Sequence, residues 1–205
     1  ATATVPRFDA SKIKVSQPAA TYDGEGEYLR YRYTESGVSP RLVPGKTEHV
    51  VVIDSDEHDE SGHITESAEV RVKMADKRMR KLEGLRAELQ EPSFDGPQEF
   101  ETLLVGFGST KGPLLEAVKL LNEKQPGGVA ALCFGDVYPL PHKKLAELAG
   151  RAKRLINVEQ NATGQLAGLI REETGIVFDA SILKYDGRQI SGEEITDRIW
   201  KGELK

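Results

Sequence analysis

The sequence predicts an α/β protein with a doubly wound, mostly parallel sheet and an extended N-terminal arm. From residue 101 onward, short apolar runs alternate with amphipathic segments of helical length. Strands separated by such helices favour a parallel sheet covered on both faces. Two of the apolar runs lead through polar turns into helices, at 102–112 and 158–166, and residues 1–46 are rich in proline and glycine without helical periodicity. Those breakers predict an extended segment before the folded domain 47–205.

Composition excludes several function classes. The 205 residues carry 28 basic and 33 acidic side chains, a net charge of −5, which gives no general attraction for nucleic acid. No apolar run approaches the roughly 20 residues that a membrane span needs. The single Cys133 cannot form an internal disulfide, which is typical of a reducing compartment. We therefore expect a cytoplasmic protein, without a leader, that binds neither nucleic acid nor membrane.

The first half of the chain predicts four elements in order. The arm 1–46 alternates aromatic and basic residues at 28–33, which predicts packing on a larger body. The β-branched run 49–53 predicts a buried strand, and an acidic loop 54–66 follows. A long outer helix is predicted at about 67–90. Its inward face would carry five apolar residues at helical spacing: Ala75, Met79, Leu82, Leu85 and Leu89. Pro92, Gly96 and Pro97 then predict a linker.

The second half predicts four strand–helix pairs. Strands are expected at 102–107, 128–134, 154–159 and 180–185. Helices are expected near 113–123, 142–149 and 162–173, and a last helix from Ser191. The inward positions of two of these helices are apolar at helical spacing: Leu114, Val118 and Leu121, then Leu166, Leu169 and Ile170. Ser191 and Glu194 have the spacing of a capping box, in which each side chain accepts a backbone N–H.

The two polar turns are candidate anion sites or interface turns. The segment 106–112 resembles a phosphate loop but has Lys111 where a dinucleotide fingerprint needs a small residue, and it lacks the Gly-Lys-Ser/Thr order of a P-loop. A helix N-terminus still offers free N–H groups to an anion. The alternative is purely structural, with Asn161 or Thr163 capping a helix. The candidate residues of the two turns are Ser109, Thr110, Lys111, Glu159, Asn161 and Thr163.

Basic and hydroxyl side chains gather in the arm. Guanidinium groups suit carboxylate or phosphate ligands, while ion pairing between domains is the alternative use. This group comprises Arg30, Arg32, Thr34, Ser39 and Arg41.

Metal and nucleophile signals are weak. Segment 54–65 has Asp59 where a calcium loop needs glycine and Thr65 where it needs glutamate. His58 and His63, with nearby carboxylates, could supply ligands for a transition metal, but a polar loop after a strand is the favoured explanation. Cys133 falls in an apolar strand and is expected to behave as a small hydrophobic residue. No catalytic residue is assigned.

Taken together, four segments resemble one family. They are 32–45, Asp54 to Glu66, Gly106 to Gly112 and Glu159 to Leu166. Their combination is similar to the C-terminal part of the α subunit of 2-oxoacid:ferredoxin oxidoreductases. The resemblance implies a transketolase C-terminal-like fold that follows a thiamine-pyrimidine domain. It also implies an enzyme that converts a 2-oxoacid, with 2-oxoglutarate favoured, to acyl-CoA and reduces ferredoxin.

The resemblance assigns the chemistry to other parts of that enzyme. The family's Tyr-Pro-Ile-Thr-Pro-type segment is absent, and one cysteine cannot hold an iron–sulfur cluster. Thiamine diphosphate, magnesium, the cluster and coenzyme A would therefore belong to the full assembly. Its partners would be the rest of the α subunit, a thiamine- and iron–sulfur-binding β subunit, and ferredoxin. The chain alone would be an inactive assembly domain, with 28–45 nearest the 2-oxoacid or coenzyme A.

Two other functions stay open at this point. A self-contained flavodoxin-like domain would bind FMN or a nucleotide at its strand ends. A pure interaction module would need no enzyme context. A yellow purified protein would favour the flavin-binding domain.

Overall fold

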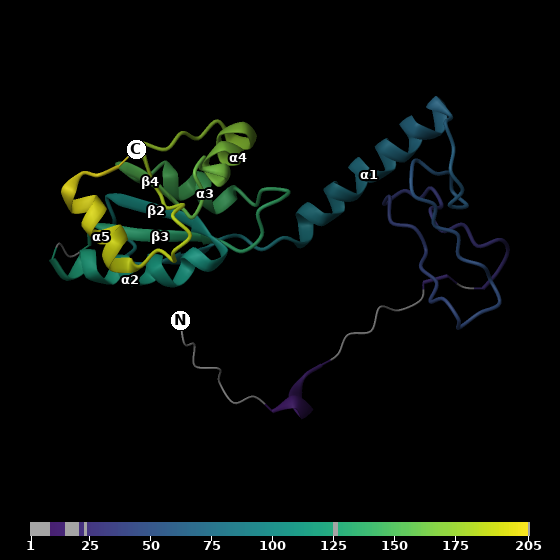
Figure 1. The fold of residues 1–205 in the computed structure, drawn as a ribbon, viewed down its shortest axis with the longest axis horizontal. Coiled ribbons are helices and arrows are strands. Elements are labelled where there is room, and N and C mark those ends of the chain that lie inside the picture. The colour runs from purple at the N-terminus through teal and green to yellow at the C-terminus, as the bar shows by residue number, and fades with distance from the viewer. Residues whose placement is uncertain (1–8, 15–20, 23, 125–126, 205) are drawn as a thin grey trace. The chain divides into compact units, whose positions relative to one another are not determined.

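The computed structural model describes residues 9–14, 21–22, 24–124 and 127–204 (Figure 1). It divides into two compact units, Ala1–Lys81 and Leu82–Lys205, which we call the loop unit and the α/β unit. The division falls inside the helix α1, Ala68–Glu88. Of the predicted arm, residues 1–8, 15–20 and 23 lie outside the described residues.

The α/β unit is built on a five-stranded sheet in the order β1-β3-β2-β4-β5. Its strands are Ser93–Asp95 (β1), Thr102–Phe107 (β2), Val129–Phe134 (β3), Arg154–Glu159 (β4) and Ala180–Leu183 (β5). All pairs are parallel except β1 with β3. The helices are Lys111–Lys124 (α2), Lys143–Ala149 (α3), Gln165–Thr174 (α4) and Gly192–Lys201 (α5), and a 3-10 turn, Gly108–Thr110 (η2), precedes α2.

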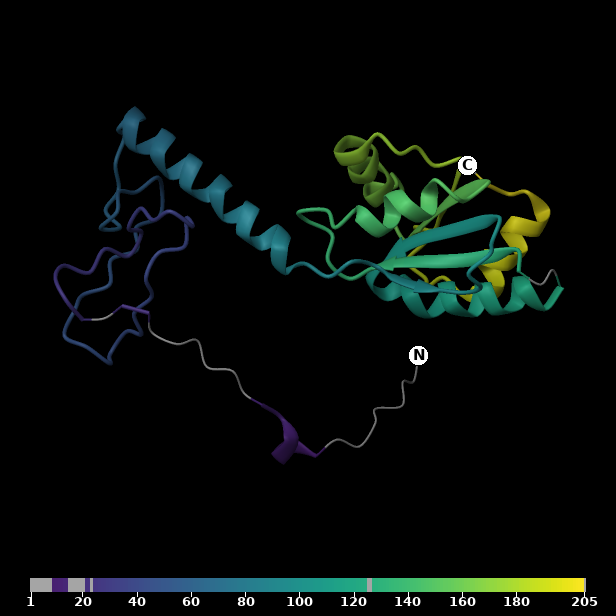
Figure 2. The ribbon, with the colours of Figure 1, turned by 180° about the vertical axis from the view of Figure 1, so that it is seen from behind.

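Helices cover both faces of the sheet. Helices α2 and α5 pack on the face that carries Leu104, Ile156 and Ile182. Helices α3 and α4 pack on the opposite face, which carries Leu103 and Leu132. Figure 2 shows the same two layers from behind. Alternate residues of each buried strand therefore enter separate cores, which is the predicted doubly wound architecture.

Periodicity located most of the α/β unit. Strands β2 and β4 have the predicted bounds, and Leu114, Val118 and Leu121 of α2 are buried as expected. Strand β1 was missed, because three residues between Pro92 and Gly96 are too short to show a period.

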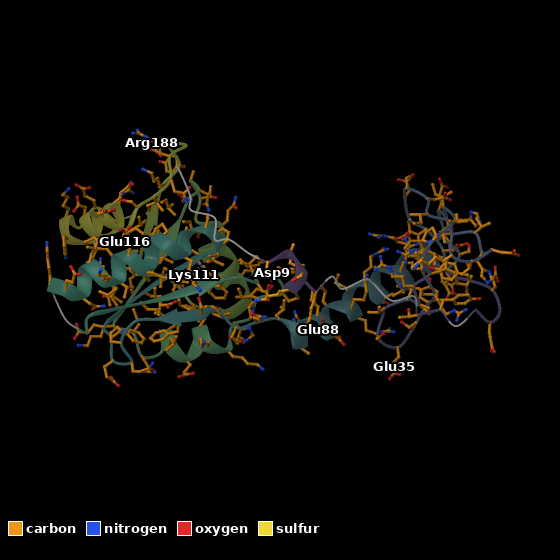
Figure 3. All side chains as sticks on the ribbon, turned by 90° about the horizontal axis from the view of Figure 1, so that it is seen from below. Asp9, Glu35, Glu88, Lys111, Glu116 and Arg188 are labelled. Carbon is orange, nitrogen blue, oxygen red and sulfur yellow. The ribbon has the colours of Figure 1, made fainter. Side chains whose placement is uncertain are left out.

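The predicted capping box is half present. The Ser191 hydroxyl accepts the N–H of Glu194, at 3.2 Å. The carboxylate of Glu194 instead pairs with Arg198 at 2.6 Å and Lys184 at 2.8 Å. Gly192 donates its N–H to Glu116 of α2, so a neighbouring helix supplies the second cap at 3.0 Å. Glu116 is labelled in Figure 3.

The loop unit contains a 3-10 turn at Ala10–Lys12 (η1), long hydrogen-bonded loops, and the first part of α1. Its buried hydrophobic residues among those described are Tyr28, Leu42 and Met74. Two predictions fail here. Residues 49–53 are not a strand, and the buried side of α1 carries Met74 and Lys77 while Met79 is 60% exposed. The loops pack on the Lys77 side, where the absent side chain of Gly37 allows close approach to the Lys77 carbonyl. Among the described residues, no helix combines the length and apolar character of a membrane span.

Candidate functional site

The carboxyl ends of β2 and β4 are the place where an open α/β sheet usually binds a ligand. Strand β3 lies on one side of β2 and β4 on the other, so the chain order reverses between β2 and β4. The turns after these two strands are the ones singled out in the sequence. The structure therefore brings the two candidate turns to neighbouring positions on one sheet edge.

The turn after β4 is closed by the protein's own carboxylate. Glu159 is fully buried and accepts the N–H groups of Leu166 at 3.0 Å and Ala167 at 3.1 Å. Its carboxylate also accepts the side-chain amide of Asn161, at 2.6 Å. The N–H groups of Leu166 and Ala167 belong to the first turn of α4, where an external anion would otherwise bind. Glu159 therefore occupies the anion position itself.

Asn161 completes this cap. Its side-chain oxygen accepts the N–H groups of Thr163 at 3.1 Å and Gly164 at 2.7 Å, with Gln165 farther, at 3.4 Å. The hydroxyl of Thr163 makes no hydrogen bond to another described residue, and the residue is exposed. Of the two predicted caps, Asn161 is the one that acts.

The turn after β2 is tightly packed. Thr110 is buried and its hydroxyl donates to the carbonyl of Phe107 at 2.9 Å, whereas Ser109 and Lys111 are exposed. Beside Lys111, labelled in Figure 3, lies a cavity of about 250 Å³ that is also bordered by Glu91 and Asp136. Asp136 accepts the N–H of Gln90 at 2.9 Å, and Glu91 that of Lys144 at 3.0 Å. Two carboxylates at its edge make this cavity a poor phosphate site.

The crevice between the two turns is apolar. A cavity of about 160 Å³ is lined by Phe107, Val137, Gln165, Leu166 and Leu169. An FMN phosphate or a nucleotide needs hydrogen-bond donors, and the donors of the α4 N-terminus are already bound to Glu159 and Asn161. The residues present therefore do not fit a flavin or a nucleotide.

Cys133 behaves as the sequence predicted. It is 5% exposed in β3, and burial raises the pKa of its thiol. A thiol with a raised pKa is a poor nucleophile.

The two histidines contact other groups of the loop unit. His58 stacks on Tyr31 with ring centres 3.6 Å apart, and its Nδ1 lies 3.1 Å from the carbonyl of Asp59. His63 is exposed and lies 3.8 Å from the carboxylate of Asp54. Within the described part of the chain, no three metal-binding side chains gather. The polar-loop alternative accounts for both residues.

Most candidates of the arm are engaged locally. Arg32 donates to the Glu27 carbonyl at 2.9 Å, Thr34 to that of Val38 at 3.1 Å, and Ser39 to that of Arg32 at 2.9 Å. The backbone of Arg41 pairs with Thr21. Arg30 differs, because its guanidinium contacts the Tyr31 ring at 5.0 Å and has no hydrogen bond or ion pair with the described residues.

An unpaired ammonium lies near Arg30. Lys77 is 6% exposed and has no carboxylate partner among the described residues, and its Nζ is 5.9 Å from the centre of the Tyr31 ring. Burial lowers the pKa of Lys77, and the charges of Lys81, Arg30 and Arg78 lower it further. Sequence reasoning missed Lys77 because its spacing on the helix is that of an ordinary solvated lysine. The loop unit therefore holds two cations next to one aromatic ring. Neither makes an ion pair with a described residue, although the charge of Glu60 is near enough to oppose the lowering of the Lys77 pKa.

Glu57 anchors the polar loop to α1. Its carboxylate accepts Arg78 at 2.7 Å and Arg71 at 2.6 Å. These bonds, Arg78 first, lower the pKa of Glu57 to about 2. The sequence showed the three charges but not that the loop would fold back onto the helix.

This ion pair predicts an acid transition in the loop unit. Because the pKa is depressed in the folded state, the stabilisation is complete above the ordinary value of 4.5 and is lost as the pH falls towards about 2. We expect a loss of about 2 kcal/mol, reduced from the full shift because Arg71 is exposed. The measurement is hydrogen exchange of the Thr65 amide, which donates to the Glu57 carbonyl. It compares wild type with Glu57→Gln between about pH 5 and about pH 2, the range over which Glu57 gains its proton. Glu57→Gln should lose the acid dependence, and Glu69→Gln, at an exposed pair, should keep it. Equal curves for wild type and Glu57→Gln would contradict the assignment.

Comparison with known proteins identifies relatives for nearly the whole chain. No protein-family model matches it. The α subunit of 2-oxoacid:ferredoxin oxidoreductase 2 from Aeropyrum pernix is 36% identical over 198 residues, which are 94% of this chain and 30% of that subunit. The α subunit of 2-oxoacid:ferredoxin oxidoreductase 1 from Sulfurisphaera tokodaii is 30% identical over 203 residues, covering 97% and 31%.

A solved structure agrees with these relatives. It is the 2-oxoglutarate:ferredoxin oxidoreductase from Magnetococcus marinus with 2-oxoglutarate, coenzyme A and succinyl-CoA bound. The TM-score is 0.81 at 27% identity, and the match covers 96% of this chain and 34% of that one. The chain thus spans about one third of the length of the proteins it matches. Over that third, its sequence and fold are similar to those of 2-oxoacid:ferredoxin oxidoreductase α subunits.

Proposed function

We propose that the chain is a non-catalytic assembly domain of a multi-subunit 2-oxoacid:ferredoxin oxidoreductase. The whole enzyme would oxidatively decarboxylate a 2-oxoacid to acyl-CoA and reduce ferredoxin, with 2-oxoglutarate as the favoured substrate. The observation that carries this function is similarity over 94–97% of the chain to α subunits of 2-oxoacid:ferredoxin oxidoreductases. In keeping with its place in such a subunit, we expect the whole enzyme in the cytoplasm.

The residues of this chain support a non-catalytic role. The switch point is filled by Glu159 and apolar side chains, and Cys133 is buried. An iron–sulfur cluster needs several thiolates, and the chain has one cysteine. The described residues contain no cluster of acidic or histidine side chains for Mg²⁺. Thiamine diphosphate, magnesium and the cluster would accordingly be held elsewhere, in the rest of the α subunit and in a β subunit.

One part of the chain fits a ligand of the whole enzyme. Arg30 and Lys77 lie near the same ring, and neither makes an ion pair with a described residue. A carboxylate of the 2-oxoacid or a phosphate of coenzyme A would supply the missing charge. Arg32 and Thr34, through side-chain hydrogen bonds to backbone carbonyls, and Arg41, through its own backbone, would shape the loop around this contact.

The first experiment is to isolate the native complex that contains this chain and to assay it. From the length of its relatives, we expect an α polypeptide about three times as long as this chain, bound to a partner subunit. The complex should reduce ferredoxin in the presence of a 2-oxoacid and coenzyme A. The 205-residue chain alone should be inactive. A native complex without this activity would overturn the proposed function.

A substitution in that complex tests the ligand contact. Arg30→Ala should raise the KM for the 2-oxoacid or for coenzyme A by roughly 10- to 100-fold, since a charge-assisted contact is lost. Arg171→Ala, an exposed arginine on α4, is the matched control and should leave both KM values within about twofold. An unchanged KM in Arg30→Ala would remove Arg30 from the site.

A further inference from the structure

Residues 49–53 are an apolar segment with the composition of a buried strand, but no strand among the described residues pairs with it. The run His49-Val-Val-Val-Ile53 has the β-branched composition of a strand that is buried on both faces. In the structure Val50 is 79% exposed and Ile53 is 61% exposed. Side chains of an extended chain alternate, so these two point to opposite faces. Each face of the segment thus presents an uncovered apolar side chain.

The C-terminal end of the segment is anchored on one side, at Asp54 and beside Gly62. Asp54 donates its N–H to the carbonyl of Gly62 at 3.1 Å, and the Asp54 carboxylate accepts the N–H of Ile64 at 2.8 Å. The Val52 carbonyl lies so close to Gly62 that a Cβ at Gly62 would overlap it. In an extended chain, Val50, Val52 and Asp54 share one edge. That edge faces Gly62.

The opposite edge makes no backbone hydrogen bond with any residue that the structure describes. The N–H groups of Val51 and Ile53 point away from Gly62 by the same alternation, and neither has a hydrogen bond with the described residues. Unpaired backbone groups next to exposed apolar side chains are the features to which an added strand binds. The anchor at Asp54 fixes one end of the segment and so reduces the conformational entropy that pairing would cost.

We propose that residues 49–53 pair, through the Val51 and Ile53 edge, with a β-strand from another part of the same α subunit. This inference rests on the proposed function. The relatives carry about two thirds of their length beyond the matched region, so covering segments exist in the same polypeptide. The loop unit buries very few hydrophobic residues of its own, and an uncovered strand edge promotes aggregation. A strand of the same polypeptide has a high effective concentration near the segment and can cover it before any subunit assembly.

Hydrogen exchange on the intact α subunit, with and without its partner subunit, tests the pairing. The amides of Val51 and Ile53 should exchange at least ~100-fold more slowly in the α subunit than in the 205-residue chain, and addition of the partner should change this little. Fast exchange in every sample would overturn the pairing. Protection that arises only with the partner subunit would assign the strand to that subunit and overturn the proposal.

Two proline substitutions in the intact α subunit identify the edge. Val51→Pro removes a donor from the free edge and should abolish protection of Ile53. Val50→Pro removes a donor from the Gly62 edge and should retain most of that protection. Equal loss in both variants would overturn the assignment of the edge. Turnover of the wild-type complex, measured separately, decides the proposed function, so failure of the pairing and failure of the function are distinguishable.

Discussion

Replacing Glu159 by alanine is expected to lower the free energy of unfolding of the α/β unit by about 3 kcal/mol. The substitution removes a fully buried carboxylate and leaves the buried N–H of Leu166, the half-buried N–H of Ala167 and the half-buried amide of Asn161 without their acceptor. It also removes a negative charge from the N-terminus of α4. Urea unfolding followed by the fluorescence of Trp200, the single tryptophan and a residue of α5, measures the change.

The neighbouring Thr163→Ala is the control. Its side chain is exposed and makes no hydrogen bond to a described residue, so we expect a change within about 0.5 kcal/mol. Glu159→Gln should fall between the two variants, because an amide keeps one acceptor but places a donor against the N–H groups. A loss below about 1 kcal/mol in Glu159→Ala would show that water replaces the carboxylate, and the turn would then be open to an external anion.

Glu159 also explains why the sequence suggested an anion site at the carboxyl end of β4. A strand that runs into a polar turn and a helix has the same residue types whether the helix binds a ligand or a carboxylate of its own chain. Burial of the carboxylate distinguishes the two cases, and burial cannot be predicted from a single glutamate at the end of an apolar strand. The strands themselves were predictable, since β2 and β4 are short, largely apolar segments that lead into polar turns.

The loop unit was the least predictable part, because its packing depends on contacts between residues that lie far apart in the sequence. Residues 49–53 have strand composition, but a strand requires a second strand, and the described residues offer none. The periodicity of α1 selected the side with Met79, whereas the loops cover Met74 and Lys77. Apolar spacing marks a face that needs cover, and it does not say which polypeptide provides the cover.

Gly106→Ala is expected to destabilise the α/β unit by about 2 kcal/mol, because the site has no room for a methyl group. An added Cβ would lie 2.6 Å from the hydroxyl of Thr110, 2.9 Å from Leu114 and 3.0 Å from the carbonyl of Val158. The Val158 carbonyl is backbone of the paired strand β4, so it cannot rotate away as a side chain can. The measurement is again urea unfolding followed by Trp200.

Gly112→Ala in the first turn of α2 is the matched control. A Cβ there meets nothing within 4 Å, and alanine favours a helix, so stability should stay equal or rise by up to about 1 kcal/mol. Opposite signs for the two variants would show that Gly106 serves close packing between β2, β4 and α2. Equal, small effects would instead mean that the edge can open, and the segment 106–112 would regain the role of an anion loop. The buried Thr110 and the apolar crevice beside Phe107 favour the first result.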